Sequence, residues 1–245
     1  MKQSVDSTRL GANRTGLQSS PSLGKLMMEN VEESEAQSAD GRALAEVRMQ
    51  YIRESEGLGS IPPPPTAKGK AKSGLKMASG LRPQAFIDKL AERLAFERGG
   101  TRLYDAVLAK FEALPDELDS VTLQDVRLLR DQEANHALLI KECIEELGGD
   151  PTAQTPSANL VGMETAGVLQ AASDPRTTLV QTLHAALAAE LVDHAGWEML
   201  VAFAENMGQD RMAERFREAL REENEHLAKV GSWYKALTLE TGELM

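Results

Sequence analysis

The chain has 245 residues, with 38 Asp and Glu against 27 Lys and Arg, a net charge of −11 and a single cysteine. One cysteine excludes an internal disulfide, the acidic balance disfavours nucleic-acid binding, and no apolar run approaches the roughly 18 residues that a membrane helix needs. Because residues 1–30 also lack the apolar core of a signal peptide, the composition predicts a cytoplasmic protein without membrane association.

The first 80 residues form a predicted extension whose charge differs from that of the rest. They carry 11 Lys and Arg against 9 Asp and Glu, so the acidic excess belongs entirely to the later residues. Residues 1–40 show little periodic apolarity, and we expect most of this stretch to be disordered. A short helix is predicted over 41–56. Residues 57–80 are rich in Pro and Lys and are predicted to be a linker, extended in polyproline conformation over 61–65 and followed by a solvated basic run.

Residues 81–245 are predicted to form a helical domain with four amphipathic helices. In each helix, apolar residues recur alternately every three and four positions, which is typical of the seam of a helix bundle. Short turns at Pro115 and at 206–210 pair the helices into hairpins. The longer link at 149–176 predicts a crossover with a short helix over 159–172. The predicted fold class is all-α, an antiparallel four-helix bundle with helices over 83–113, 121–148, 176–206 and 208–238.

Ionisable residues occupy seam positions near the middle of these four helices. They include two copies of Glu-x-x-His, in which residues three apart share one helix face and can bind one ion together. Each unpaired buried ion costs several kcal/mol, but two divalent cations would neutralise four buried glutamates, and two imidazoles would add nitrogen ligands. The sequence therefore predicts a buried dimetal site with candidate ligands Glu97, Glu133, His136, Glu190, Asp193, Glu223 and His226.

This ligand pattern resembles the di-iron or di-manganese carboxylate site of the ferritin-like superfamily. The resemblance covers about residues 83–240. It is greatest for the bacterioferritin and rubrerythrin branch, in which a Tyr follows the first glutamate by seven residues, as Tyr104 follows Glu97. The resemblance implies that Glu133 and Glu223 bridge the two metals. It also implies that each of the other four ligands binds only one of the two metals: Glu97, His136, Glu190 and His226. Asp193 stands where relatives often carry Glu, and its role is left open.

The resemblance also implies a function. We expect two bound iron ions, with manganese possible, in an oxidoreductase of the ferroxidase or peroxidase type that oxidises Fe(II) or reduces oxygen or hydrogen peroxide. A homo-oligomer, dimer or larger, is expected. The chain has no Cys-x-x-Cys pair, so electrons must come from Fe(II) itself or from a separate donor. The alternatives are an iron-storage shell subunit, a rubrerythrin-like peroxidase, a manganese catalase, and a metal-free helical stress or scaffold protein.

Other residues near the seam have less specific interpretations. Tyr104 has either a redox or hydrogen-bonding role beside the metals or an ordinary core position with its hydroxyl satisfied. Gly99 and Gly100 interrupt the first helix, either for substrate approach or a bulge, or for close helix packing. His194 is off the seam and is expected at the surface. No function is assigned to His184, and core packing is expected for Cys143, Trp197 and Trp233.

Overall fold

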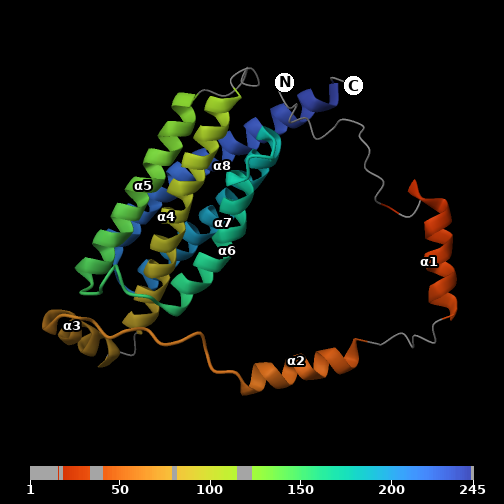
Figure 1. Ribbon diagram of the computed structural model, residues 1–245. Helices are drawn as coiled ribbons and strands as arrows, with labels where there is room; N and C mark the ends of the chain where they lie inside the picture. The colour runs from red at the N-terminus through yellow and green to blue at the C-terminus, as the bar shows by residue number, and fades with distance from the viewer. Residues whose placement is uncertain (1–15, 17–18, 34–40, 79–81, 115–122, 244–245) are drawn as a thin grey trace. The chain divides into compact units, whose positions relative to one another are not determined.

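The computed structural model of the chain describes residues 16, 19–33, 41–78, 82–114 and 123–243. Over these residues the predicted all-α class is confirmed, since all eight regular elements are helices (Figure 1). The chain divides into two compact units at Gly57 and Leu58. In the part of the chain that is described, no helix is long and apolar enough to cross a membrane.

The unit before Leu58 contains two helices, α1 (Pro21–Glu33) and α2 (Arg42–Glu54). Residues 1–15, 17–18 and 34–40 of the stretch predicted to be disordered lie outside the described residues, and α1 forms between them. Pro21 stands at the first position of α1, where its fixed φ and missing N–H suit a helix start. Helix α2 lies inside the range 41–56 predicted to be helical, and its apolar side chains are exposed.

The segment 57–80, predicted to be a linker, contains a helix that the prediction did not include, α3 (Ala67–Ala78), whereas residues 61–64 form no helix. The prolines end at Pro65, and the Ala and Lys residues that follow have high helix propensity. The start of α3 is also held against the loop after the fifth helix, because a Cβ on Gly69 would lie only 2.6 Å from the carbonyl oxygen of Gly148. Close contact between two glycine backbones therefore replaces the expected solvated tether.

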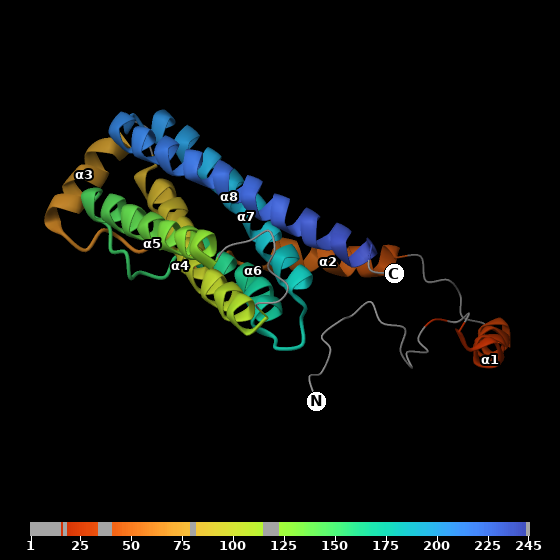
Figure 2. The same cartoon turned by 90° about the horizontal axis from the view of Figure 1, so that it is seen from above.

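The remaining five helices contain all the residues predicted as metal ligands. Helix α4 packs along α5, α7 packs along α8, and α6 lies against both α4 and α7 (Figures 1 and 2). The predicted turn at Pro115 lies outside the described residues, whereas the turn between α7 and α8 contains Gly208 with a φ of +63°, a conformation that favours glycine. The bounds are α4 Pro83–Ala113, α5 Leu123–Glu146, α6 Pro156–Ser173, α7 Leu179–Asn206 and α8 Asp210–Glu243.

Side-chain caps define the segment between α5 and α7. Thr155 accepts a hydrogen bond from the backbone N–H of Ala158 at the start of α6, and Pro156 occupies the first helical position. At the start of α7, Thr178 and Gln181 form a reciprocal capping box. These caps fix where each helix begins, so the long predicted link becomes a well-defined helix that covers one side of α4 and α7.

The apolar core is divided into two clusters. One contains Leu103, Phe111, Leu129 and Trp233, and the other contains Trp197 and Cys143 with other apolar residues near the opposite ends of the same helices. The core positions predicted for Cys143, Trp197 and Trp233 are therefore confirmed. Between the two clusters lies a layer of buried charged residues. This layer is the part of the core that apolar packing does not explain.

Candidate metal centre

All seven residues predicted as metal ligands lie in this buried layer. Helix α4 contributes one of them, and α5, α7 and α8 contribute two each. Each side chain reaches the centre because the three- and four-residue spacing puts it on the inward face of its helix. None is more than 3% exposed: Glu97, Glu133, His136, Glu190, Asp193, Glu223 and His226.

Glu223 stands at the centre of the cluster. Its Oε1 atom lies 2.7 Å from Nδ1 of His136, and its Oε2 atom lies 3.3 Å from Nδ1 of His226. Each oxygen of one carboxylate therefore faces a different imidazole. This is the arrangement that a carboxylate needs to contact two neighbouring cations at once.

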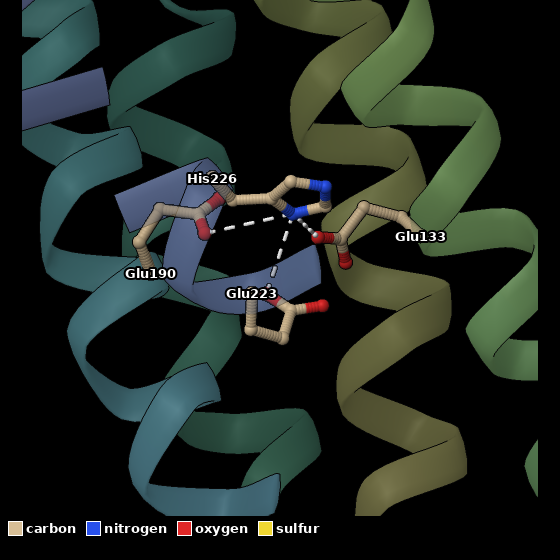
Figure 3. A group of neighbouring side chains, drawn as sticks. All are labelled: Glu133, Glu190, Glu223 and His226. Atoms are coloured by element: carbon tan, nitrogen blue, oxygen red, sulfur yellow. Dashed lines mark ion pairs between the residues drawn. The ribbon is translucent and has the colours of Figure 1, made fainter. Parts of the chain in front are cut away.

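One half of the cluster gathers around His226. Its Nδ1 atom lies 3.3 Å from Oε1 of Glu133 and 3.8 Å from Oε2 of Glu190, as Figure 3 shows. With Glu223, these residues offer ligand atoms that all lie within 4.8 Å of one another, so the group could hold a metal ion. We call Glu133, Glu190 and His226, with the residues that contact them, the His226 half.

The other half gathers around His136. Nδ1 of His136 lies 3.8 Å from Oε2 of Glu97, and these two residues form a second possible ligand group with Glu223. A third overlapping group contains Glu97, Glu133, Asp193 and Glu223. Glu223 thus belongs to every group found among the described residues. We call Glu97, His136 and Asp193, with the residues that contact them, the His136 half.

The outer nitrogen of each histidine is also held, by residues that the sequence reasoning missed. Nε2 of His136 donates to Oε2 of Glu222 at 2.8 Å, and Nε2 of His226 donates to Oε1 of Gln132 at 3.0 Å. Because Nε2 is the donor in each case, the neutral ring presents the Nδ1 lone pair to the cluster. The sequence signal was available, since Gln132 and Glu222 directly precede the two motif glutamates.

Arg93 is the second feature that sequence reasoning missed. Its side chain is buried, with Nε 2.8 Å from Oε1 of Glu97 and Nη1 3.1 Å from Oδ1 of Asp193. Gly196 provides the room, because a Cβ there would lie 1.9 Å from Nη1. The available signal was the four-residue spacing, which brings the side chain of Arg93 within reach of Glu97, although Arg93 lies outside the predicted apolar row. Asp193, whose role the sequence left open, is thus the ion-pair partner of a buried arginine.

Gly100 allows the carboxylate of Glu133 to enter the cluster. A Cβ on Gly100 would lie 2.1 Å from Oε2 and 2.9 Å from Cδ of Glu133, so any side chain there would displace this group. A Cβ on Gly99 would meet only Thr165, at an ordinary contact distance of 3.6 Å. The two neighbouring glycines therefore differ, and only Gly100 makes room for a candidate ligand.

Tyr104 contacts the cluster directly. Its hydroxyl donates a hydrogen bond to Oε1 of Glu190, and its ring is buried in the apolar core on that side. Burial, followed by the negative charge of Glu190, raises the pKa of the Tyr104 hydroxyl well above its ordinary value. The hydroxyl therefore keeps its proton and orients Glu190 through a neutral hydrogen bond.

Comparison with known families places this layer in a recognised domain. Residues 83–241, which span α4 to α8, match the family described as Domain of unknown function (DUF892). The chain belongs to this family. No curated protein and no solved structure matches the chain.

The DUF892 region contains every residue of the cluster and of its surroundings, from Arg93 to His226. His194, expected at the surface, is only partly exposed, and its Nε2 atom lies 3.0 Å from Oδ1 of Asn224. His184 is exposed, and its ring lies 5.6 Å from that of Tyr234. Trp197 packs edge-on against His136 at 5.3 Å, so it fills the core and also limits the motion of that ring.

The electrostatics of the DUF892 cluster show what burial does to its carboxyl groups. Burial, and then the charge of Asp193, raises the pKa values of Glu97 and Glu133 well above the ordinary range. Burial and the charge of Glu223 raise the pKa of Glu190 to about 8. Glu223 is the exception, because its contacts with His136 and His226 outweigh burial and lower its pKa to about 2.

The pKa of His136 shifts in the opposite direction from that of an ordinary buried histidine. Burial by itself lowers its pKa, but the contact with Glu223 and the charge of Glu97 raise it to about 9. Bound protons thus offset the negative charge of the carboxylates when no cation is present. Many of the inward-facing atoms nevertheless make ion-pair contacts at most and no hydrogen bond of good geometry, including both oxygens of Glu97, Glu133 and Glu223 and the Nδ1 atoms of His136 and His226. Such a set of buried oxygen and nitrogen atoms, poorly satisfied within the protein, fits a metal ion.

Proposed function

We propose that this DUF892 protein binds two divalent metal ions, iron by preference, at the buried cluster and oxidises Fe(II) with oxygen or hydrogen peroxide. The single observation that supports this most is the position of Glu223. Each of its two oxygens faces the inner nitrogen of a different histidine, and all three possible ligand groups share it. In this proposal Glu223 would be a ligand of both ions.

The ligand groups suggest how the two ions would be held. Glu97 and His136 would bind one ion, and Glu190 and His226 the other. Glu133 contacts the His226 half and also belongs to the group with Glu97, which agrees with a second bridge. The sum of charges also balances when Arg93 is included. Five buried carboxylates and one guanidinium leave a net charge of −4, which two divalent cations would neutralise.

The fold gives independent support. We propose a ferritin-like antiparallel four-helix bundle formed by α4, α5, α7 and α8, with a long crossover that contains α6. Each of the four helices supplies the ligand types expected of such a bundle, one Glu from α4 and α7 and Glu-x-x-His from α5 and α8. We further propose that this bundle is the functional domain at 81–245, that residues 1–80 are an extension, and that the protein is a cytoplasmic homo-oligomer.

The protein groups have defined tasks in this proposal. Gln132 and Glu222 orient the two imidazoles, and Tyr104 orients Glu190. The apolar clusters on both sides exclude water, which strengthens every electrostatic contact in the layer. Bound redox-active ions would supply the electrons that reduce the oxidant, and a separate donor would be needed for repeated turnover with peroxide.

Metal content tests the proposal. The full chain, purified without chelators, should contain or take up about two Fe(II) or Mn(II) ions per chain under anaerobic conditions. Addition of oxygen or peroxide to the Fe(II)-loaded protein should then oxidise the bound Fe(II) in a single round of reaction. A metal content near zero that neither ion raises would reject the proposal and favour a helical scaffold protein. A hollow particle carrying hundreds of irons would instead identify a storage subunit.

A further inference from the structure

We propose that a pocket between α4, α6 and α7 binds a neutral, largely apolar small molecule beside the metal centre. The pocket has a volume of about 390 Å³. This inference goes beyond the proposed function, because the pocket needs no metal to exist and none of the residues that line it is a candidate metal ligand.

The chemistry of the lining points to an apolar ligand. Phe96, Leu103 and Val168 are among the apolar side chains that form the walls, and glycine and alanine complete most of the rest. The hydroxyl of Thr165 donates to the carbonyl oxygen of Val161, so its proton is already used. Glu164, whose residue is exposed, is the one ionisable residue of the lining. The lining therefore offers apolar surface and few polar groups, as most small-molecule sites do.

Gly99 and Gly100 connect the pocket to the cluster. Both line the pocket, and the position of a Cβ on Gly100 is occupied by the carboxylate of Glu133. The backbone of Gly100 thus contacts the pocket and a candidate bridging ligand at the same time. Two further lining residues, Leu103 and Ala189, are the chain neighbours of Tyr104 and Glu190. A molecule in the pocket would therefore contact Gly100, whose backbone adjoins the carboxylate of Glu133, and the chain neighbours of Tyr104 and Glu190.

Size and charge narrow the class of ligand. A cavity of about 150 Å³ holds a benzene molecule, so a pocket of about 390 Å³ suits roughly ten to fifteen non-hydrogen atoms. Glu164 and the nearby acidic cluster disfavour an anion, because a carboxylate or phosphate placed in the pocket would meet like charge in an apolar setting. The occupant that fits best is therefore an uncharged molecule such as a medium-chain alcohol, and a fatty-acid anion fits poorly.

The neutral fluorophore N-phenyl-1-naphthylamine serves as the probe, in titrations of the metal-free full chain. The test variant is Gly99→Leu, because its added Cβ makes only an ordinary contact with Thr165 while the longer side chain fills pocket volume. The matched control is Gly167→Leu on α6, where an added Cβ meets nothing within 4 Å. Both substitutions replace a helical glycine by a good helix former, so both variants should fold.

We expect saturable binding of one probe molecule per chain in the wild type and in Gly167→Leu, and a dissociation constant at least about tenfold higher in Gly99→Leu. Decanol should displace the probe, whereas decanoate at equal concentration should not. Equal affinity in all three proteins, or no saturable binding, overturns the proposal. Displacement by decanoate as strong as by decanol overturns the preference for a neutral ligand.

Two further outcomes separate this inference from its alternatives. The pocket could instead be covered by a second copy of the chain. In that case probe binding will fall as protein concentration rises and a dimer forms, and this result overturns the proposal. Metal stoichiometry of the same three proteins is measured separately by elemental analysis. Probe binding without metal binding would reject the proposed function alone, and metal binding without probe binding would reject the pocket alone.

Discussion

The two halves of the cluster contain the same Glu-x-x-His motif but are supported by different chemistry. In the His136 half, the outer ring nitrogen donates to the carboxylate of Glu222, and Arg93 forms ion pairs with Glu97 and Asp193. In the His226 half, the corresponding ring nitrogen donates to the neutral amide of Gln132, and Glu190 accepts from the neutral hydroxyl of Tyr104.

The difference shows that a repeated motif can be placed in unequal surroundings. The His136 half depends on full charges. Those of Arg93, Glu97 and Asp193 are buried, so they interact strongly and are costly to leave unpaired, whereas the side chain of Glu222 is 40% exposed. The His226 half depends on neutral hydrogen bonds, which contribute less each and leave a smaller penalty when lost. We therefore expect substitutions of the supporting residues to have larger effects in the His136 half.

The largest effect is expected at the residue that both halves share. Glu223→Gln keeps the shape of the side chain but removes its charge, so metal affinity should fall by more than about 100-fold and the paired stoichiometry should be lost. Metal titration with elemental analysis measures both. Glu225→Gln is the matched control, because Glu225 is exposed on the same helix and should leave binding unchanged. Equal losses in the two variants would show that the inward face of α8 is assigned wrongly.

Arg93→Met tests the charged support of the His136 half. The substitution leaves Glu97 and Asp193 without their buried cation, and the free energy of unfolding of the metal-free protein should fall by about 3–5 kcal/mol. Urea unfolding measures this loss. Adding Asp193→Asn should restore part of the stability, since the unpaired carboxylate is then absent. A double variant no more stable than the single one would argue against the ion pair.

Glu222→Ala and Gln132→Ala compare the two histidine partners directly. Each substitution removes the acceptor that fixes its ring, and losses of such partners typically lower metal affinity by about 10- to 100-fold. The loss should be greater for Glu222→Ala, because a carboxylate makes the imidazole a stronger donor than an amide does. Competition with a chelator gives both affinities. Equal losses would mean that the two halves are equivalent in this respect.

Gly100→Ala and Gly99→Ala form a pair of neighbours with opposite expectations. The added methyl group of Gly100→Ala collides with the carboxylate of Glu133, so metal affinity should fall by about tenfold. The Gly99 variant makes an ordinary contact with Thr165 and should bind metal normally. Both variants should fold, because alanine stabilises a helix interior by about 1 kcal/mol over glycine. Normal metal binding by the Gly100 variant would contradict the proposed position of Glu133.

Tyr104→Phe should have the smallest effect. It removes one neutral hydrogen bond to Glu190, which is worth about 1 kcal/mol, and leaves the ring in place. Chemical denaturation should show this modest loss, while the metal stoichiometry stays unchanged. A loss as large as that of Arg93→Met would remove the distinction between charged and neutral support.

Much of the fold and of the cluster follows from helix periodicity. On α7 and α8 the alternating three- and four-residue rows are buried along their whole length, and the ionisable residues within them are buried too. The periodicity works because each of these rows faces one shared core. It located the seven candidate ligands, although their binding of metal stays a prediction.

Helix α4 shows why the rest was missed. Ile87 and Thr101 continue the three- and four-residue spacing that contains Glu97, yet they are only partly buried, whereas Phe86, Arg93 and Gly100 are buried on a neighbouring row. The reason is α6, which packs against α4 and covers a second face. A periodicity argument assigns one buried face to each helix, so it classes an arginine on another face as solvated. The packing of α6 depends on contacts between distant segments that no local pattern specifies.

The charged layer between the two apolar clusters also affects how the molecule should open. Isolated helices fray from their ends, but here the ends are held by packed hydrocarbon, whereas the middle contains buried carboxyl groups that need bound protons to offset their charge when no cation is present. The metal-free protein should therefore exchange its amide hydrogens first at mid-helix around Glu133 and Glu223. If the cluster binds metal as proposed, a protease should cut the metal-free protein first at mid-helix, while both ends of the bundle stay folded.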